Sequence, residues 1–361
     1  MPDPTTRLAE RALRDEPPGE EEARRMLDGD GFPLLPLLHA AYVPRERHFG
    51  RRVMVHVLNN VQNGLCPEDC GYCSQSRDSK AQLRKYPMKE SAEILEGAER
   101  AARAGASRYC IVSSGRGPTL EQARRLGEIV RSVKQRFPIE VCLSVGLLGE
   151  EQARILAEAG LDRLNHNLNT SEARYPEICS THSYADRVRT LIAAKKCGIE
   201  PCSGLIVGMG ETSRDVVEVA FTLRELEVRS IPVNFLIPIE GNPVLSDGSL
   251  TPERCLRALA LMRLVNPSAE IRVAGGREGH LRSLQALALW PANSLFVEGY
   301  LTTQGDAVRD TYQMIREAGF EVEGNPLSEA SAVGGEDGDT GFRLAGRDGE
   351  ILRPEVVRSG S

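Results

Sequence analysis

Residues 108–146 read RYCIVSSGRGPTLEQARRLGEIVRSVKQRFPIEVCLSVG and contain the unit from which the fold can be inferred. The stretch opens with a β-rich segment at Arg108–Ser114 and closes with another at Glu140–Gly146. Between them, a polar, glycine-containing loop leads into a stretch of helical periodicity at Leu120–Arg136. A strand, a loop and a helix followed by the next strand therefore form the repeating unit.

The same alternation continues on both sides of this stretch. Six more β-rich segments occur at Val53–Asn63, Arg163–Asn169, Glu200–Gly208, Ser230–Pro238, Glu270–Gly276 and Ser294–Tyr300. Helical periodicity recurs at Glu90–Ala104, Thr212–Val228 and Asp306–Ala318. Eight such units over roughly 250 residues predict an α/β fold of the (β/α)8 TIM-barrel type. A doubly wound open sheet is the alternative, because periodicity does not reveal closure, and both folds place the chemistry at the C-terminal ends of the strands.

Composition narrows the class of protein. The chain has 361 residues, 41% of them hydrophobic, with 45 Lys and Arg against 51 Asp and Glu. This hydrophobic content supports a buried core, and the net charge of -6 argues against a general nucleic-acid or anionic-membrane surface. No apolar run approaches the ~18 residues of a membrane span, and the first residues show no secretory signal. We therefore expect a cytoplasmic protein with neither a nucleic acid nor a membrane as partner.

The two ends differ from the middle of the chain. Residues 1–45 are charged and interrupted by proline, and they predict a helical extension with an amphipathic helix near Glu20–Leu27. Residues 46–324 would form the barrel. From Asn325 to the end the chain is rich in Gly, Asp, Glu and Ser, which predicts a flexible tail over residues 325–361.

Three of the nine cysteines lie together in residues 63–76, NGLCPEDCGYCSQS, directly after the first predicted strand. Cys66, Cys70 and Cys73 form a C-x3-C-x2-C pattern, and thiolates select zinc, Cu(I) or iron–sulfur clusters. A structural zinc site needs four ligands, so a zinc site would require a distant fourth residue. Three thiolates on a four-iron cluster leave one iron open to a substrate or cofactor. Chance clustering of buried thiols is the remaining alternative.

This pattern resembles the cysteine motif of the radical S-adenosylmethionine (SAM) superfamily. The resemblance implies that Cys66, Cys70 and Cys73 hold a [4Fe-4S] cluster whose open iron chelates the amino and carboxylate groups of SAM. It also implies that Tyr72 packs on the adenine, although a tyrosine that merely anchors the loop would give the same sequence.

A second set of cysteines is spread over the predicted strands. Cys110, Cys142 and Cys202 can each point into a barrel interior, because side chains alternate between the two faces of a strand. Each one taken alone fits a buried structural thiol. Arg272 on the seventh predicted strand is harder to explain, because a charge inside a barrel needs a partner.

The order of several motifs resembles the biotin synthase family from about Arg47 to Phe320. These motifs are YCSQS, NHNLNTS, CSGLIVGMGET, VNF, IRVAGGRE and ANSLFVEGYLTT, together with Cys110 and Cys142. The resemblance implies that Cys110, Cys142, Cys202 and Arg272 hold a [2Fe-2S] cluster, the sulfur donor that turns dethiobiotin into biotin. The remaining cysteines match no ligand position and are interpreted as structural thiols: Cys179, Cys197 and Cys255.

Three asparagines alternate with other residues on the fourth predicted strand. A period of two places Asn165, Asn167 and Asn169 on one face, where buried amides need partners. The resemblance assigns Asn165 and Asn167 to the substrate, and Asn167 with Asn169 to the nucleoside of SAM; some family members carry Asp at the position of Asn169. His166, on the opposite face, is interpreted as a structural histidine.

The strand end GLIVGMGE, residues 204–211, matches the superfamily pattern G-x-I-x-G-x-x-E. The resemblance places Gly204, Ile206 and Gly208 beside SAM. Glycine at the first and last of these positions allows either a flat adenine or the next backbone to come close.

By the same resemblance, Asn234 contacts the ureido group, and Thr302 with Thr303 binds the substrate carboxylate. A helix N-cap before Asp306 is an equal alternative for the two threonines.

The implied reaction is sulfur insertion at two unactivated C–H positions, which no side-chain acid or base can achieve, so a cofactor has to supply a radical. No flavin or nicotinamide motif is visible, so a flavodoxin- or ferredoxin-type protein is the expected electron donor, and the family implies a homodimer. Two alternatives stay open: another radical SAM enzyme, such as a hydrogenase-maturation or methylornithine-forming relative, and a non-catalytic iron–sulfur redox sensor.

Overall fold

Nine parallel strand segments form the centre of the protein. They are β1 (Arg52–Gln62), β2 (Arg108–Ser113), β3 (Glu140–Ser144), β4 (Arg163–Asn165), β5 (Glu200–Cys202), β6 (Leu205–Val207), β7 (Ser230–Phe235), β8 (Glu270–Val273) and β9 (Ser294–Phe296). β5 and β6 are the two halves of one interrupted strand, so the segments make eight barrel strands. The computed structural model describes residues 3–244, 248, 250–297, 299–300, 303–304 and 308–324.

The barrel is closed by its first and last strands. β1 pairs with β2 along one side and with β9 along the other, where Met54 lies opposite Ser294 and His56 opposite Phe296. Every one of these pairings is parallel. Closure confirms the predicted (β/α)8 barrel and excludes the open sheet.

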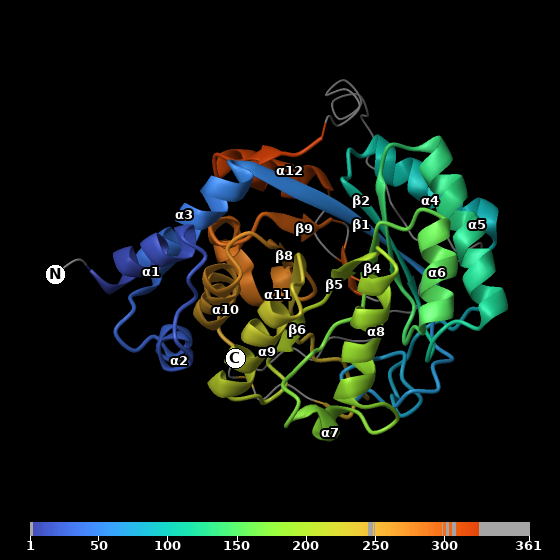
Figure 1. Ribbon diagram of the computed structural model, residues 1–361, viewed down its shortest axis with the longest axis horizontal. Helices are drawn as coiled ribbons and strands as arrows, with labels where there is room; N and C mark the ends of the chain where they lie inside the picture. The colour runs from blue at the N-terminus through green and yellow to red at the C-terminus, as the bar shows by residue number, and fades with distance from the viewer. Residues whose placement is uncertain are drawn as a thin grey trace.

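Helices surround the barrel in the order that the sequence predicts (Figure 1). They are α4 (Ser91–Arg103), α5 (Leu120–Arg136), α6 (Glu150–Glu158), α7 (Tyr175–Ile178), α8 (Tyr184–Lys196), α9 (Ser213–Glu225), α10 (Pro252–Val265), α11 (Arg277–Leu281), the 3-10 helix η1 (Arg282–Leu289) and α12 (Val308–Glu317). Local sequence fixes their starts: α5, for example, begins at a capping box in which Thr119 and Gln122 bond each other's backbone N–H. Three short strands complete the described elements: β10 (Gly299–Tyr300), β11 (Thr303–Gln304) and β12 (Glu321–Val322).

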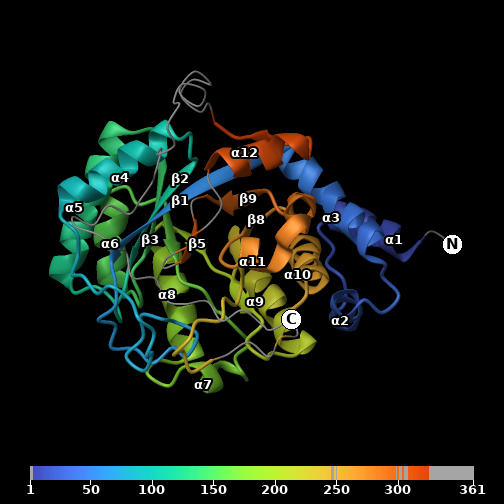
Figure 2. The same ribbon diagram turned by 180° about the vertical axis from the view of Figure 1, so that it is seen from behind.

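The N-terminal segment is helical, as predicted, and consists of α1 (Pro4–Leu13), α2 (Glu20–Asp28) and α3 (Leu34–Phe49). These helices lie on one side of the barrel, where α2 and α3 pack on α10 (Figure 2). This cover explains why α10 is buried from Cys255 to Val265 without an exposed face. The division into residues 1–45, 46–324 and 325–361 stays a prediction; α3 runs across the first boundary, and the tail lies outside the described residues.

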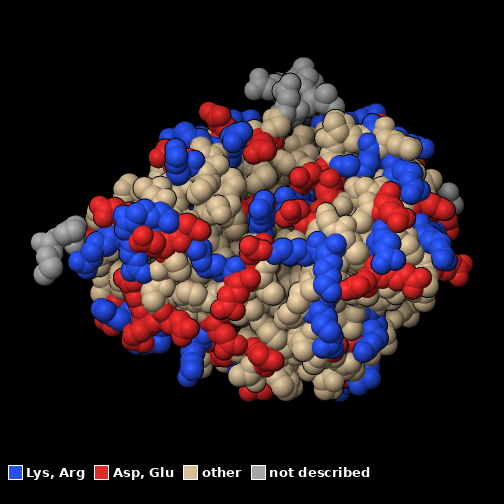
Figure 3. All heavy atoms as spheres, viewed as in Figure 1, with Lys and Arg blue, Asp and Glu red and all other residues tan. Residues whose placement is uncertain are grey.

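The surface carries both signs of charge. On the face shown in Figure 3, acidic and basic side chains are interspersed, and neither sign gathers into one large patch. None of the helices in the described ranges is both long enough and apolar enough to span a bilayer.

Candidate functional site

The cysteine triplet occupies the loop between β1 and α4, at the C-terminal end of β1. Cys70 is buried, whereas Cys66 and Cys73 are half-buried. A turn holds the loop: Cys73 N donates to Cys70 O at 3.0 Å, and Gly71 N donates to Ile178 O at 2.8 Å. Burial raises the pKa of the Cys66 thiol and raises that of Cys73 to about 11. These thiols therefore stay protonated at neutral pH until a metal replaces their protons.

Tyr72, within the triplet loop, is held by one residue that follows β4 and one in α8. Its hydroxyl accepts hydrogen bonds from Asn169 Nδ2 at 2.5 Å and from Arg187 Nη2 at 3.3 Å. Asn169 has a left-handed backbone with φ of 71°, which asparagine tolerates better than most residues. The three side chains thus form a polar contact at the mouth of the barrel.

The second cysteine set converges inside the barrel. Cys110 and Cys142 are directly paired on β2 and β3, and the Cys142 thiol interacts with those of both Cys110 and Cys202. Arg272 Nη1 donates to Cys202 Sγ at 3.7 Å. All four side chains are at most 5% exposed. The expected juxtaposition of three thiols with one arginine is therefore present.

A layer of charged and polar residues supports this set, and sequence reasoning missed it. Glu270 accepts from Arg272 Nη2 at 2.5 Å, from Ser294 Oγ at 2.8 Å and from Ser230 Oγ at 3.2 Å, and it pairs with Arg108 Nη2 at 3.0 Å. Burial opposes the charges of Glu270 and Arg272, but attraction outweighs it: Arg108 and Arg272 lower the pKa of Glu270, and Glu270 raises the pKa of Arg272. The layer could have been found from spacing, because residues 108 and 270 lie two positions before residues 110 and 272 and so share their faces.

A cavity of about 240 Å³ connects the two cysteine sets. Tyr72 and Cys73 lie in its wall, as do Cys110, Cys142 and Arg272. The remaining predicted residues that line it are Asn165, Asn167, Asn169, Ile206 and Asn234. Most of the predicted cofactor- and substrate-binding residues thus surround one space between the two sets.

The amides in this wall already have protein partners. Asn165 Nδ2 donates to Asn167 Oδ1 at 3.2 Å and to Cys202 Sγ at 3.3 Å. Asn234 donates to Leu205 O and accepts from Gly275 N, both at 3.0 Å. A bound substrate would have to share or replace these bonds.

His166 differs from its prediction. It also lines the cavity, because β4 ends at Asn165 and the alternation of faces stops there. Its side chain is buried, and its Nε2 has no hydrogen-bond partner within the described part of the chain, so it is not a satisfied structural histidine.

Gly204 and Gly208 are required by the backbone conformation and by the packing of neighbouring strands. A Cβ on Gly204 would lie 1.8 Å from Pro232 O, so the missing side chain allows β7 to approach. Gly208 adopts φ of 101°, where other residues are strained. Neither glycine lines the cavity, and their contact with SAM stays a prediction. Thr302 lies outside the described residues; Thr303 lies in β11, and its side chain is outside them as well.

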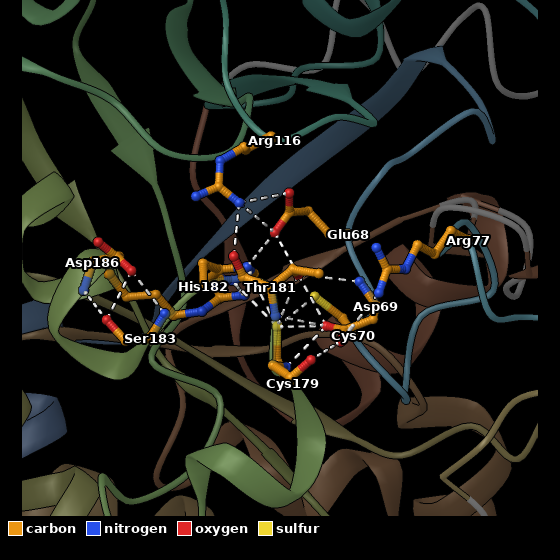
Figure 4. A network of polar contacts seen from close by, with 12 residues as sticks. Glu68, Asp69, Cys70, Arg77, Arg116, Cys179, Thr181, His182, Ser183 and Asp186 are labelled. Atoms are coloured by element: carbon orange, nitrogen blue, oxygen red, sulfur yellow. Dashed lines mark hydrogen bonds and ion pairs between the residues drawn. The ribbon is translucent and has the colours of Figure 1, made fainter.

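The sequence predicts a structural thiol at Cys179, but this residue lies beside the triplet. Its Sγ is 3.7 Å from Cys70 Sγ, although the two residues are 109 positions apart. His182 Nδ1 lies 3.3 Å from the same sulfur (Figure 4). Cys197 is half-buried at the C-terminal end of α8, and Cys255 is fully buried in α10.

Comparison with known proteins gives consistent results. Residues 62–223 match the family model of the radical SAM superfamily, and residues 232–321 match that of the biotin and thiamin synthesis associated domain. A biotin synthase of Acaryochloris marina is 54% identical over 340 residues, covering 94% of this chain and 97% of that protein. A biotin synthase of Magnetococcus marinus is 54% identical over 316 residues, covering 88% and 98%.

Solved structures show the same fold at low sequence identity. A methylornithine synthase superposes with a TM-score of 0.75 at 19% identity, covering 87% of this chain and 97% of that chain. The FeFe-hydrogenase maturase of Carboxydothermus hydrogenoformans gives 0.74 at 17% identity, covering 88% and 79%.

Proposed function

This chain belongs to the biotin synthase family of radical SAM enzymes, and we propose that it inserts sulfur into dethiobiotin to form biotin. The observation that carries this proposal is the convergence of Cys110, Cys142, Cys202 and Arg272 inside the barrel, where all but Cys202 line the same cavity as Tyr72 and Cys73. A radical SAM enzyme of another kind would not need this second ligand set.

The triplet fits a [4Fe-4S] cluster. It supplies three soft thiol ligands from one loop at the mouth of the barrel, which leaves one iron for the amino and carboxylate groups of SAM. When bound, this cluster supplies the electron that cleaves SAM to methionine and a 5′-deoxyadenosyl radical. Tyr72 and Asn169 would position the nucleoside, and the closed barrel wall would keep water from the reacting atoms.

The inner set fits a [2Fe-2S] cluster. Arg272 Nε has no hydrogen-bond partner within the described ranges although it is buried, and the thiols of Cys202 and Cys110 lie near the same guanidinium. A bound cluster would satisfy these donors, which are otherwise costly to bury. When bound, this cluster supplies the sulfur atom.

The amides between the two sets suit the substrate. Asn165, Asn167 and Asn234 both donate and accept, as a ureido ring requires. Held against these amides, dethiobiotin would lie between the nucleoside and the inner set, so that its reacting carbons face both. Gly204, Ile206 and Gly208 would lie beside SAM, and Thr302 with Thr303 would bind the substrate carboxylate.

Electrons have to come from another protein, because no flavin or nicotinamide motif is visible in the sequence. A flavodoxin- or ferredoxin-type donor, a homodimer and a cytoplasmic location belong to the same proposal.

Product analysis tests the proposal. Anaerobically purified protein, loaded with iron and sulfide, is incubated with dethiobiotin, SAM and a reductant. We expect biotin and two cluster types per chain; Cys142→Ala should lose biotin while still cleaving SAM, and Cys255→Ala, which alters a buried thiol outside both sets, should retain both activities. A lone [4Fe-4S] cluster with SAM cleavage but no biotin would instead indicate another radical SAM enzyme. The absence of SAM cleavage would indicate a redox sensor.

A further inference from the structure

Two loops from distant parts of the sequence meet beside the cysteine triplet. One carries Asp69 and Cys70, and the other joins α7 to α8 and carries Cys179 and His182 (Figure 4). The Asp69 side chain ties the loops together: its Oδ1 accepts from Ser180 N at 3.0 Å and from Thr181 N at 3.1 Å. The arrangement of the side chains between them is therefore set by two anchored loops.

Three potential metal ligands converge at this junction. Cys70 Sγ and Cys179 Sγ are 3.7 Å apart, Cys179 Sγ and His182 Nδ1 are 3.3 Å apart, and all three atoms lie within 4.8 Å of one another. All three residues are buried. A tetrahedral zinc ion with ordinary Zn–S and Zn–N bond lengths holds its ligand atoms roughly 3.5–3.8 Å apart. The distances from Cys179 Sγ to the other two ligand atoms are thus close to those around a single tetrahedral ion.

The surroundings complete a site for a cation. Asp69 Oδ1 lies 3.2 Å from Cys179 Sγ, and Glu68 contacts His182 Nδ1, so a carboxylate is available as a fourth ligand after a small shift. His182 Nε2 lies 2.9 Å from the Tyr175 hydroxyl and 2.9 Å from Arg187 Nη2, which donates to it. With a metal on Nδ1, Nε2 would carry the proton and donate to the Tyr175 hydroxyl, which fixes the ring, while Arg187 Nη2 would keep its bond to the Tyr72 hydroxyl.

We propose that the chain without its clusters binds one divalent transition-metal ion through Cys70, Cys179 and His182. Two thiols and an imidazole suit Zn²⁺, Co²⁺ and Fe²⁺, and each thiol that binds releases its proton. This group shares Cys70 with the triplet but contains neither Cys66 nor Cys73. The single ion and the [4Fe-4S] cluster therefore compete for Cys70, a consequence that rests on the proposed function of the triplet.

Cobalt binding tests the site without requiring any enzyme activity. Co²⁺ is titrated anaerobically into the reduced, iron-free chain, and thiolate-to-cobalt charge transfer and tetrahedral ligand-field bands are recorded. We expect one tight equivalent in the wild type. Loss of an outer-sphere partner already weakens metal sites by about 10- to 100-fold, so Cys179→Ser and His182→Gln should each weaken binding at least that much. Cys197→Ser, which removes a half-buried thiol elsewhere, should bind like the wild type.

Alkylation of the wild type provides a readout that depends on no variant. With Zn²⁺ bound, Cys70 and Cys179 should be protected while Cys66 and Cys73 react; with the cluster bound, the three triplet cysteines should be protected. Zinc added first should slow cluster loading in the wild type but not in Cys179→Ser, which keeps the whole triplet.

Two results would overturn the site. One is undiminished cobalt affinity in Cys179→Ser whose circular dichroism matches that of the wild type. The other is protection of Cys66 and Cys73 together with Cys70 by zinc alone. A failure to make biotin would refute the proposed function and leave the cobalt result standing.

Discussion

Replacing Glu270 by glutamine should destabilise the protein strongly, because the carboxylate neutralises two buried arginines. Its side chain is 4% exposed and lies 2.5 Å from Arg272 Nη2 and 3.0 Å from Arg108 Nη2. With charge centres near 4 Å and an effective dielectric constant of about 20, each pair contributes about 4 kcal/mol before desolvation. Removing one partner of a buried ion pair costs about 3–5 kcal/mol net, a large part of a stability of roughly 5–15 kcal/mol.

Urea unfolding of the reduced, cluster-free chain measures this loss through circular dichroism. Glu140→Gln is the matched control, since Glu140 lies 2.7 Å from the same Arg108 but is 42% exposed; we expect a loss of at most about 1 kcal/mol. Equal losses in the two variants would refute the reasoning.

We also expect the stability difference between the wild type and Glu270→Gln to depend on pH. Burial opposes ionisation of Glu270, but Arg108 and Arg272 outweigh it and hold its pKa well below the usual range. A lowered carboxyl pKa stabilises the fold above the unfolded value of about 4.3, and this stabilisation is lost as the pH falls further. The difference between wild type and Glu270→Gln should therefore be constant from pH 7 to about 5 and shrink below about pH 4. A difference that grows with acidification would contradict this account.

Three further changes have defined outcomes. Tyr72→Phe leaves Asn169 Nδ2 without the acceptor it now has at 2.5 Å, so we expect about 1–3 kcal/mol lower stability and weaker SAM binding by calorimetry; unchanged SAM affinity would remove Tyr72 from the nucleoside site. Gly204→Ala places a Cβ 1.8 Å from Pro232 O and should cost at least about 1–3 kcal/mol in urea unfolding, whereas a neutral result would mean that β7 can move away. Burial holds the pKa of His166 well below its usual value, so unfolding binds a proton below about pH 6.5. Wild-type stability should therefore fall with acidification by up to about 1.4 kcal/mol per pH unit more than that of His166→Gln. Parallel slopes would show instead that His166 takes up its proton in the folded chain as readily as in the unfolded chain.

Periodicity was sufficient to predict the order of strands and helices, because each strand–helix unit is local in sequence. It did not predict that the fifth strand is interrupted between Cys202 and Leu205, or that β4 ends at Asn165. Both features depend on contacts with neighbouring strands, such as the close approach of Gly204 to β7, which a pattern along one chain does not contain.

The placement of the cysteines shows the same limit. Cys110 and Cys142 could be expected to meet, because they occupy equivalent positions on successive strands of a parallel sheet. Glu270 and Arg108 were missed although strand alternation places them on the same faces as Arg272 and Cys110. Cys179 could not be predicted beside Cys70, because only the folded path of two loops brings them together.

The layer formed by Glu270, Arg108, Ser230 and Ser294 closes one end of the barrel interior. Below the inner thiols the interior of the barrel is filled by these four side chains, which are at most 4% exposed. A molecule that reaches the inner thiols therefore has to enter through the cavity lined by Tyr72.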